Sequence, residues 1–320
     1  MTTGTTDWSA VTRDATVKQY ETRIAKLESE LEHTNSTLER TRKARRAKLP
    51  APNRVTARLP GDKVRVLIPD THGAKVSKPA LAAVLADIKT LNPHEVILLG
   101  DHVDCGGFLA QHHVMGYVAE TEYSYEEDLE HANAFLDALR QVAPNAKIEY
   151  IEGNHERRVE TWCVTQTLRH TRDSEALRRL YAPEFRLDLG KREIAYYRQG
   201  VFYDDLPIPG VIKRGNCYFF HGISTSKNAV ATTVSQIAGN CVFGHTHRSQ
   251  SEIVRRVGSG VIGSWNPGCL CELQPLWTHT APTNWTHGYA VQLVAPSDRF
   301  LHLNIPVLDG QTHFTQLFKL

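Results

Sequence analysis

Short apolar runs recur along the chain, and five of them end in a turn that carries Asp, Asn or His. The first run, Val64–Ile68, leads into Asp70 and His72. A short apolar run bounded by Gly and polar residues is typical of a buried strand. The four later examples lie in Val96–Asp104, Ile148–Glu156, Cys217–Gly222 and Cys241–His247. The pattern therefore predicts strands that deliver metal-ligand side chains from their C-terminal ends.

The spacing of apolar residues also predicts the elements between these turns. Helical spacing occurs in 78–91, from the capping box Ser124–Glu127 to about Val142, in 157–181 as one or two helices, and near 226–238. Strands are predicted over 64–68, 95–99, 146–151, 193–198, 216–220, 240–243, 251–257, 289–294, 300–305 and 313–318. Because helices and strands alternate in the first half and strands dominate the second, we expect an α/β protein. Two sheets would pack face to face with helices outside them.

The N-terminal part has a different pattern. Apolar residues follow a heptad spacing, with Val17, Ile24, Leu31 and Leu38 at one position and Tyr20 and Leu27 at the other. About three heptads favour a parallel coiled coil that would join two chains as a homodimer through residues 17–38. One amphipathic helix packed on its own domain is an equal alternative. We expect a disordered tail over 1–13, a helical or coiled-coil arm over 14–48, a Pro-containing linker over 49–61 and one large domain over 62–320.

The positive charge is concentrated on the arm. Residues 1–58 hold 12 Lys and Arg against 7 Asp and Glu, whereas the remainder holds 25 against 28. The basic run between Arg40 and Lys48 is a solvated helix end in the simpler interpretation, and a nucleic-acid contact in the other.

Composition places the chain among globular proteins, with 41% hydrophobic and 22% charged residues. The six Cys lack zinc-finger or redox spacing and are read as small buried hydrophobes. The N-terminus has no apolar signal region, and no apolar run approaches the ~18 residues of a membrane span. We therefore expect a cytoplasmic protein without a membrane anchor.

The polar turns carry a mixed set of ligand types. Carboxylate and amide oxygens with imidazole nitrogens suit manganese, and alternatively iron, zinc or magnesium, better than calcium. Asp101 has two carboxylate oxygens and can bridge two ions. Two ions ~4 Å apart would stabilise both the attacking and the leaving oxygen of a phosphoryl transfer.

This series of motifs resembles the calcineurin-like metallophosphoesterases over roughly residues 62–307. The motifs are Asp70-x-His72, Gly100-Asp101-x-x-Asp104, Gly153-Asn154-His155-Glu156, His221-Gly222, Gly244-His245-x-His247 and Asn266-Pro267-Gly268. The resemblance implies a four-layer α/β/β/α sandwich. It implies one divalent ion on Asp70, His72, Asp101 and His247, and a second on Asp101, Asn154, His221 and His245. His155 would be the acid or a phosphate contact, oriented by Asp104.

One position departs from the family's protein phosphatases, in which an Arg after the second motif contacts the phosphate. Here Cys105 stands at that position. Arg157 and Arg158 could replace it, although the outer face of a helix is the simpler interpretation for at least one of them. His102 is either a structural histidine or a peripheral substrate contact.

The sequence therefore predicts a dinuclear phosphoesterase in which a metal-bridging hydroxide attacks in line. Phosphodiesters are the expected substrates, among them nucleic acids or nucleotides. The alternatives are a phosphomonoesterase or protein phosphatase, and a coiled-coil scaffold with a vestigial site.

Overall fold

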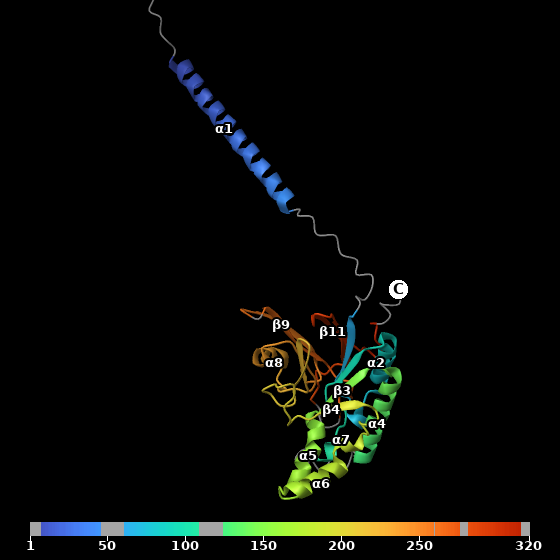
Figure 1. Ribbon diagram of the computed structural model, residues 1–320. Helices are drawn as coiled ribbons and strands as arrows, with labels where there is room; N and C mark the ends of the chain where they lie inside the picture. Colours follow the sequence, from blue (N-terminus) through green and yellow to red (C-terminus); the bar gives the residue numbers. More distant parts are fainter. Residues whose placement is uncertain (1–7, 46–60, 109–123, 259, 276–280, 315–320) are drawn as a thin grey trace, which may run out of the picture. The chain divides into compact units, whose positions relative to one another are not determined.

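The computed structural model describes residues 8–45, 61–108, 124–258, 260–275 and 281–314. Its internal contacts divide the chain into two units, Met1–Arg58 and Leu59–Leu320. The first unit contains the helix α1 (Trp8–Arg45) and the second contains all other elements (Figure 1). Among the described helices, none is both long and apolar enough to cross a membrane.

The helix α1 begins within the stretch that the sequence predicted to be disordered. No Gly or Pro interrupts Trp8–Arg45, so the helix extends past the first apolar heptad position toward the N-terminus. Along α1 the heptad residues Val17, Tyr20, Ile24, Leu27 and Leu31 are 48% to 64% exposed. The apolar stripe therefore lies on the surface of α1.

The second unit is built on two mixed sheets. The first has the strand order β11-β10-β1-β2-β3-β4, and the second has the order β5-β6-β7-β9-β8. The strands are β1 (Lys63–Ile68), β2 (Glu95–Leu98), β3 (Lys147–Ile151), β4 (Ile194–Tyr197), β5 (Ile212–Arg214), β6 (Cys217–Phe220), β7 (Cys241–Phe243), β8 (Ser249–Arg256), β9 (Gly260–Pro267), β10 (Gly288–Val294) and β11 (Phe300–Pro306). Strands β1 to β4 run parallel, as do β6, β7 and β9. The parallel strands therefore end at a common edge in each sheet.

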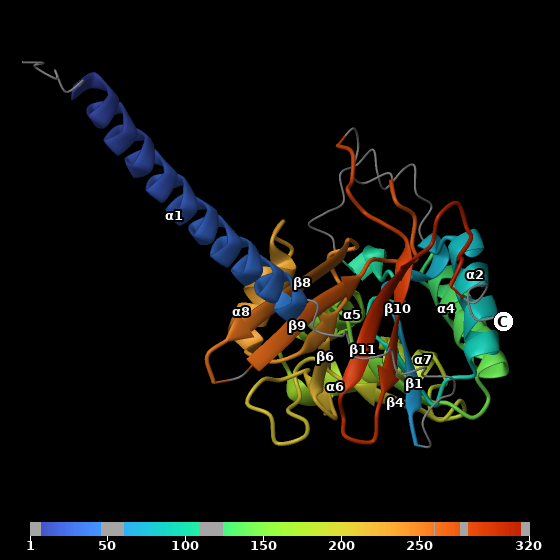
Figure 2. The same cartoon turned by 90° about the horizontal axis from the view of Figure 1, so that it is seen from above.

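Helices cover the outer faces of both sheets. They are α2 (Lys78–Leu91), α4 (Tyr125–Val142), α5 (Asn154–Gln166), α6 (Thr171–Tyr181), α7 (Pro183–Arg186) and α8 (Ala229–Ile237), with short 3-10 turns η1 (Gly73–Lys75) and η2 (Gly106–Phe108). Figure 1 and Figure 2 show α2 and α4 on one side of the unit and α8 on the opposite side, beyond the second sheet.

Alternation of side chains along the strands creates three separate apolar layers. In β1, Val64, Val66 and Ile68 pack with the helices, whereas Leu67 faces the other sheet. A third layer joins Phe220 and Phe243 to α8. Three apolar layers require four layers of secondary structure, so the predicted α/β/β/α sandwich is confirmed.

Most predicted elements are present, and the differences have local reasons. Helix α2 matches its prediction, and Ser124 Oγ accepts a hydrogen bond from Glu127 N (3.3 Å) at the start of α4. The sequence missed β5, α7 and β9; β9 contains two Gly and a Pro, which disfavour a strand, but β8 pairs along its whole length. Of the strand predicted over 313–318, His313 and Phe314 are not in a strand and the rest lies outside the described residues.

A buried ion pair between the two sheets generates a prediction about acid stability. Glu149 in β3 accepts hydrogen bonds from Arg214 Nη2 (2.6 Å) and Tyr197 Oη (2.8 Å). Burial would raise the pKa of Glu149, but Arg214 and Lys147 lower it from 4.5 to about 2. Its contribution to stability is therefore present above pH 4.5 and is lost as the pH falls toward 2.

We predict that Glu149→Gln lowers the unfolding free energy by about 3 kcal/mol at pH 7, since Arg214 loses its buried counter-charge and keeps only the exposed Asp204 (2.9 Å). The variant should also lose stability less steeply than the parent protein between pH 4.5 and pH 2. Urea unfolding across this range measures both effects. Asp137→Asn, which breaks an exposed pair with Arg192, should change stability by less than about 0.5 kcal/mol. Equal effects of the two substitutions would contradict the prediction.

Candidate metal centre

The turns that follow five parallel strands meet at one place between the two sheets. Asp70 follows β1, Asp101 follows β2, Asn154 follows β3, His221 follows β6, and His245 and His247 follow β7. Several of these residues have a left-handed backbone that non-Gly residues rarely adopt: φ is 52° at His72, 53° at Asp101, 70° at His245 and 57° at His247. The surrounding structure holds this strain at the site, as is common in functional centres.

Two glycines allow the turns to approach one another. A Cβ at Gly153 would lie 2.0 Å from Asp101 Oδ1, and a Cβ at Gly244 would lie 2.4 Å from Asp70 Oδ2. Neither separation is compatible with a side chain, so both positions require Gly because of close packing.

The first group of converging atoms surrounds His221. His221 Nδ1 donates to Leu99 O (2.8 Å), so in the neutral ring Nε2 carries a lone pair. That Nε2 faces Asn154 Oδ1 (2.8 Å), His245 Nδ1 (3.1 Å) and Asp101 Oδ2 (3.1 Å). Three other buried or half-buried atoms with lone pairs thus surround His221 Nε2. This arrangement is favourable only with a cation or a proton among these atoms.

The protonation of His221 follows from the same geometry. Burial alone would lower the pKa of His221, but the charge of Asp101 and its hydrogen bond raise it to about 10. In contrast, burial and the nearby His221 lower the pKa of His245 to about 4. A proton on His221 occupies the position that a bound cation would take.

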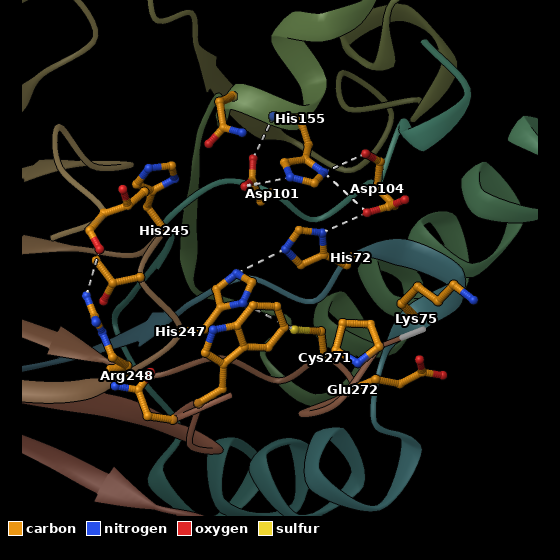
Figure 3. Close-up of a pocket in the computed structure, with 16 residues that line it drawn as sticks. His72, Lys75, Asp101, Asp104, His155, His245, His247, Arg248, Cys271 and Glu272 are labelled. Atoms are coloured by element: carbon orange, nitrogen blue, oxygen red, sulfur yellow. Dashed lines mark hydrogen bonds and ion pairs between the residues drawn. The ribbon is translucent and has the colours of Figure 1, made fainter. Parts of the chain in front are cut away.

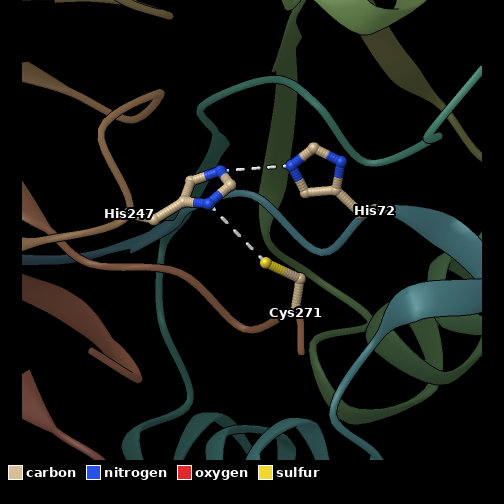
Figure 4. A group of neighbouring side chains, drawn as sticks. All are labelled: His72, His247 and Cys271. Carbon is tan, nitrogen blue, oxygen red and sulfur yellow. Dashed lines mark hydrogen bonds between the residues drawn. The ribbon is translucent and has the colours of Figure 1, made fainter. Parts of the chain in front are cut away.

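The second group surrounds His72. His72 Nδ1 bonds to Asp104 Oδ1 (3.0 Å), and its Nε2 lies 3.1 Å from His247 Nε2. That nitrogen of His247 is also 3.2 Å from Asp70 Oδ1. Figure 4 shows both ring nitrogens of His247 directed at neighbours, one at His72 and the other at Cys271, whose Sγ lies 3.9 Å from His247 Nδ1. Burial would lower the pKa of His72, but Asp104 and Asp101 raise it to about 9.

These two groups fit a pair of divalent cations. Asp101 takes part in both, because its carboxylate oxygens lie close to His221 and His245 and also close to His72 and His155. Each group combines carboxylate oxygen with imidazole nitrogen, and the first adds the amide of Asn154. Such donors suit divalent ions of the first transition row or magnesium.

Glu156 is a buried carboxylate that holds the turns after β2 and β3, which carry candidate ligands. Its role was not predicted from the sequence. It accepts hydrogen bonds from the backbone N–H groups of Asp101 (3.0 Å), His102 (2.7 Å) and Gly153 (2.9 Å), and from Tyr150 Oη (2.6 Å). Burial, and then the charge of Asp101, raise the pKa of Glu156 to about 7. Glu156 lies three residues after Gly153, in the first turn of α5, and this spacing is the sequence feature that could have indicated its role.

Asp128 in α4 plays a similar part for the turn after β1 and, together with Glu156, for the turn after β2. Its carboxylate accepts from Ala74 N (3.2 Å), Asp104 N (3.2 Å) and Cys105 N (2.9 Å). The turn after β1 and the turn after β2 are thereby fixed to one buried helical side chain. The sequence offered only a weak signal, an acidic residue beside the apolar face of a helix.

A cavity of about 260 Å³ opens over the two groups (Figure 3). The predicted residues that line it are His72, Asp101, Asp104, Asn154, His155, His245 and His247. Asp70 and His221 contribute from the buried side of the site. The lining residues that the sequence analysis missed include Lys75, Thr246, Arg248, Cys271 and Trp285.

The three predicted substrate contacts do not line this cavity. His102 is 1% exposed, bonds to Thr71 Oγ1 (3.0 Å) and packs on Phe135 and Tyr150, so it belongs to the core. Arg157 is exposed and reaches Gln199 Oε1 (3.5 Å). Arg158 donates to His155 Nε2 (2.7 Å) and to Asp104 O (3.0 Å), so it touches the site only through His155.

Comparison with known proteins identifies the family. A model of the calcineurin-like phosphoesterase family matches residues 65–241, which is more than half of the chain. The chain therefore belongs to this family, whose members hydrolyse phosphoesters and typically bind divalent metals. No curated protein sequence gives a significant match.

Several solved structures are similar to this chain at low sequence identity. A Vps29 single mutant from Entamoeba histolytica is 16% identical, with 78% of this chain and 95% of that chain covered and a TM-score of 0.36. Vacuolar protein sorting 29 from Cryptosporidium parvum is 13% identical, with 78% and 94% covered and a TM-score of 0.38. The phosphoesterase YfcE from E. coli is 15% identical, with 75% and 98% covered and a TM-score of 0.31. At these scores the likeness carries no argument about function.

The role of Asp128 can be tested by substitution. We predict that Asp128→Ala lowers the unfolding free energy by about 2–4 kcal/mol, because three buried N–H groups lose their acceptor. Affinity for Mn²⁺ should also fall, by about tenfold, since the turns that carry His72 and Asp104 are no longer fixed. Denaturant unfolding and metal titration measure these effects. Glu130→Ala, at an exposed position of the same helix, serves as the control, and an equally stable Asp128→Ala protein would refute the role.

Proposed function

We propose that the protein is a dinuclear metal-dependent phosphoesterase. The observation that carries this proposal is the sharing of Asp101 by two groups of converging acceptor atoms. One ion would be held by Asp70, His72, Asp101 and His247, and the other by Asp101, Asn154, His221 and His245. When bound, two such ions polarise a phosphate and lower the pKa of water.

His155 supplies the protein's own proton chemistry in this proposal. Its Nδ1 faces two acceptors of Asp104, the backbone O (2.6 Å) and Oδ1 (3.2 Å), so Nδ1 carries a hydrogen and the ring orientation is fixed. Burial lowers the pKa of His155, and the neutral Nε2 accepts from Arg158. An entering phosphate anion favours protonation of Nε2, while Arg158 keeps its hydrogen bond to Asp104 O (3.0 Å). His155 then holds a proton for the leaving oxygen.

The preferred substrate in this proposal is a phosphodiester. A monoester dianion brings one more negative charge than a diester, and a phosphatase offsets it with an Arg after the second motif. Cys105 occupies that position here with φ of 49°, and its side chain is fully buried. A missing charge-assisted contact costs about 1.5–3 kcal/mol, which disfavours the monoester.

The test compares two aryl phosphates with the Mn²⁺-loaded protein. We predict that kcat/KM for bis(p-nitrophenyl) phosphate exceeds that for p-nitrophenyl phosphate by about tenfold or more.

Asp101→Asn should lose activity and bound metal together, because both groups depend on this carboxylate. Asp173→Asn, at an exposed position of α6, is the matched control. A higher kcat/KM for the monoester would overturn the diester assignment, and a fully active Asp101→Asn enzyme would remove the two-metal proposal.

We also propose that α1 joins two chains as a coiled coil. The exposed stripe of Val17, Tyr20, Ile24, Leu27 and Leu31 keeps the heptad spacing over two heptads. An apolar stripe of this kind is stable in water when a second helix covers it.

Light scattering of the full-length protein tests the coiled coil. We predict a dimer at tens of micromolar, a concentration at which association with a Kd of ~10⁻⁶ M is evident. The double substitution Ile24→Glu and Leu31→Glu should produce a monomer, since it places four carboxylates in the contact between the helices. Lys26→Glu lies outside the stripe and should leave the dimer intact. A parent protein that is monomeric at this concentration would refute the proposal.

A further inference from the structure

Arg248 is a cation in the cavity that the proposed chemistry does not use. It follows the metal-ligand candidate His247 and lines the cavity together with His72, Asp101 and His155. In Figure 3 it lies on the side of His245, away from His155 and Asp104. An anion bound at Arg248 would therefore lie on the opposite side of the metal ligands from the proposed proton donor.

The surroundings of Arg248 fix its position but leave its charge unpaired. Its Nη2 donates to Thr225 O (3.1 Å) and Ser226 O (2.5 Å), and within the described part of the chain no carboxylate forms an ion pair with it. Its Nε is buried without a hydrogen-bond partner. By contrast, Arg214 is neutralised by Glu149 (2.6 Å). A fixed guanidinium without a counter-charge is suited to an anionic ligand oxygen.

A partly exposed aromatic ring lies in the wall of the same cavity. The indole of Trp285 packs edge-on against the imidazole of His247, with ring centroids 4.1 Å apart and an interplanar angle of 77°. Aromatic rings next to cations form the common binding surface for nucleic-acid strands, in which bases stack on the ring and phosphates meet the cation. Lys75 also lines the cavity, but in Figure 3 its amine points away from His72.

We propose that Arg248 and Trp285 form a subsite for the nucleoside phosphate next to the scissile phosphodiester. This rests on the proposed phosphodiesterase function and gives it a substrate class, an oligonucleotide-type diester with a second phosphate one nucleoside away. The scissile phosphate lies over the metal ligands with its leaving oxygen toward His155. The neighbouring nucleoside contacts Trp285, and its second phosphate pairs with Arg248.

Binding of two nucleotides to the Mn²⁺-loaded full-length protein tests the subsite without turnover. Thymidine 3′,5′-bisphosphate should bind the parent protein about 10- to 100-fold more tightly than thymidine 5′-monophosphate, because only the bisphosphate reaches Arg248. Arg248→Gln should remove this difference, and Arg248→Lys should keep part of it, since the charge remains. Arg255→Gln, which removes the same charge from an exposed position of β8, should leave it unchanged. Calorimetry gives the affinities, and metal analysis of each variant shows whether the centre is intact.

The outcomes separate this inference from the proposed function. If Arg248→Gln keeps its metal and still prefers the bisphosphate as the parent protein does, the subsite is refuted although bis(p-nitrophenyl) phosphate is hydrolysed. If the parent protein hydrolyses neither the bis ester nor a thymidine dinucleotide, the phosphodiesterase function is refuted. In turnover, a 5′-phosphorylated thymidine dinucleotide should have a KM about 10-fold or more below that of the unphosphorylated dinucleotide. This difference should be absent in Arg248→Gln.

Discussion

The convergence of lone pairs on Asp101 is the constraint on which the site depends. His245 Nδ1, Asn154 Oδ1 and Asp101 Oδ2 each lie within hydrogen-bond distance of His221 Nε2, and the other ring nitrogen of His221 is bonded to Leu99 O. Acceptors this close repel one another in a buried place unless positive charge lies between them. The pKa of His221 is raised to about 10 for the same reason, because a proton on the ring supplies part of the positive charge that the acceptors require. The fold therefore brings together, where the two sheets meet, acceptor atoms that require positive charge between them.

Such an arrangement persists only because other groups hold the turns in place. Left-handed backbone at His72, Asp101 and His247 costs free energy at each position. Glu156 and Asp128 offset this cost by accepting backbone N–H groups from the turns after β1, β2 and β3. Both carboxylates are buried, and burial raises the pKa of each, so each is stabilised chiefly by the hydrogen bonds that it accepts. The rigidity of the centre thus comes from buried carboxyl groups that do not line the cavity.

The candidate ligands could be found in the sequence because they follow a local rule. A buried strand is recognisable from its apolar run, and the polar residue after it must lie at the strand's C-terminal end. Parallel strands bring those ends together, so Asp70, Asp101 and Asn154 could be placed near one another without coordinates. Residues whose role depends on distant partners were harder to find. Asp128 reaches the turns from the first turn of α4, and β9 forms because β8 pairs with it despite two Gly and a Pro.

The same distinction between local and distant partners explains which arginines line the cavity. Arg157 and Arg158 are next to His155 in the sequence, but a helix turns successive residues to different faces, so Arg157 points to solvent and Arg158 reaches His155. Arg248 comes from a turn of the other sheet and enters the cavity beside His245. Cys105 is buried on the His155 side, so in the proposed subsite a substrate anion meets Arg248 on the other side of the candidate metal ligands. A substrate that matches this asymmetry carries its second negative charge on the part that stays behind after cleavage, not on the leaving group.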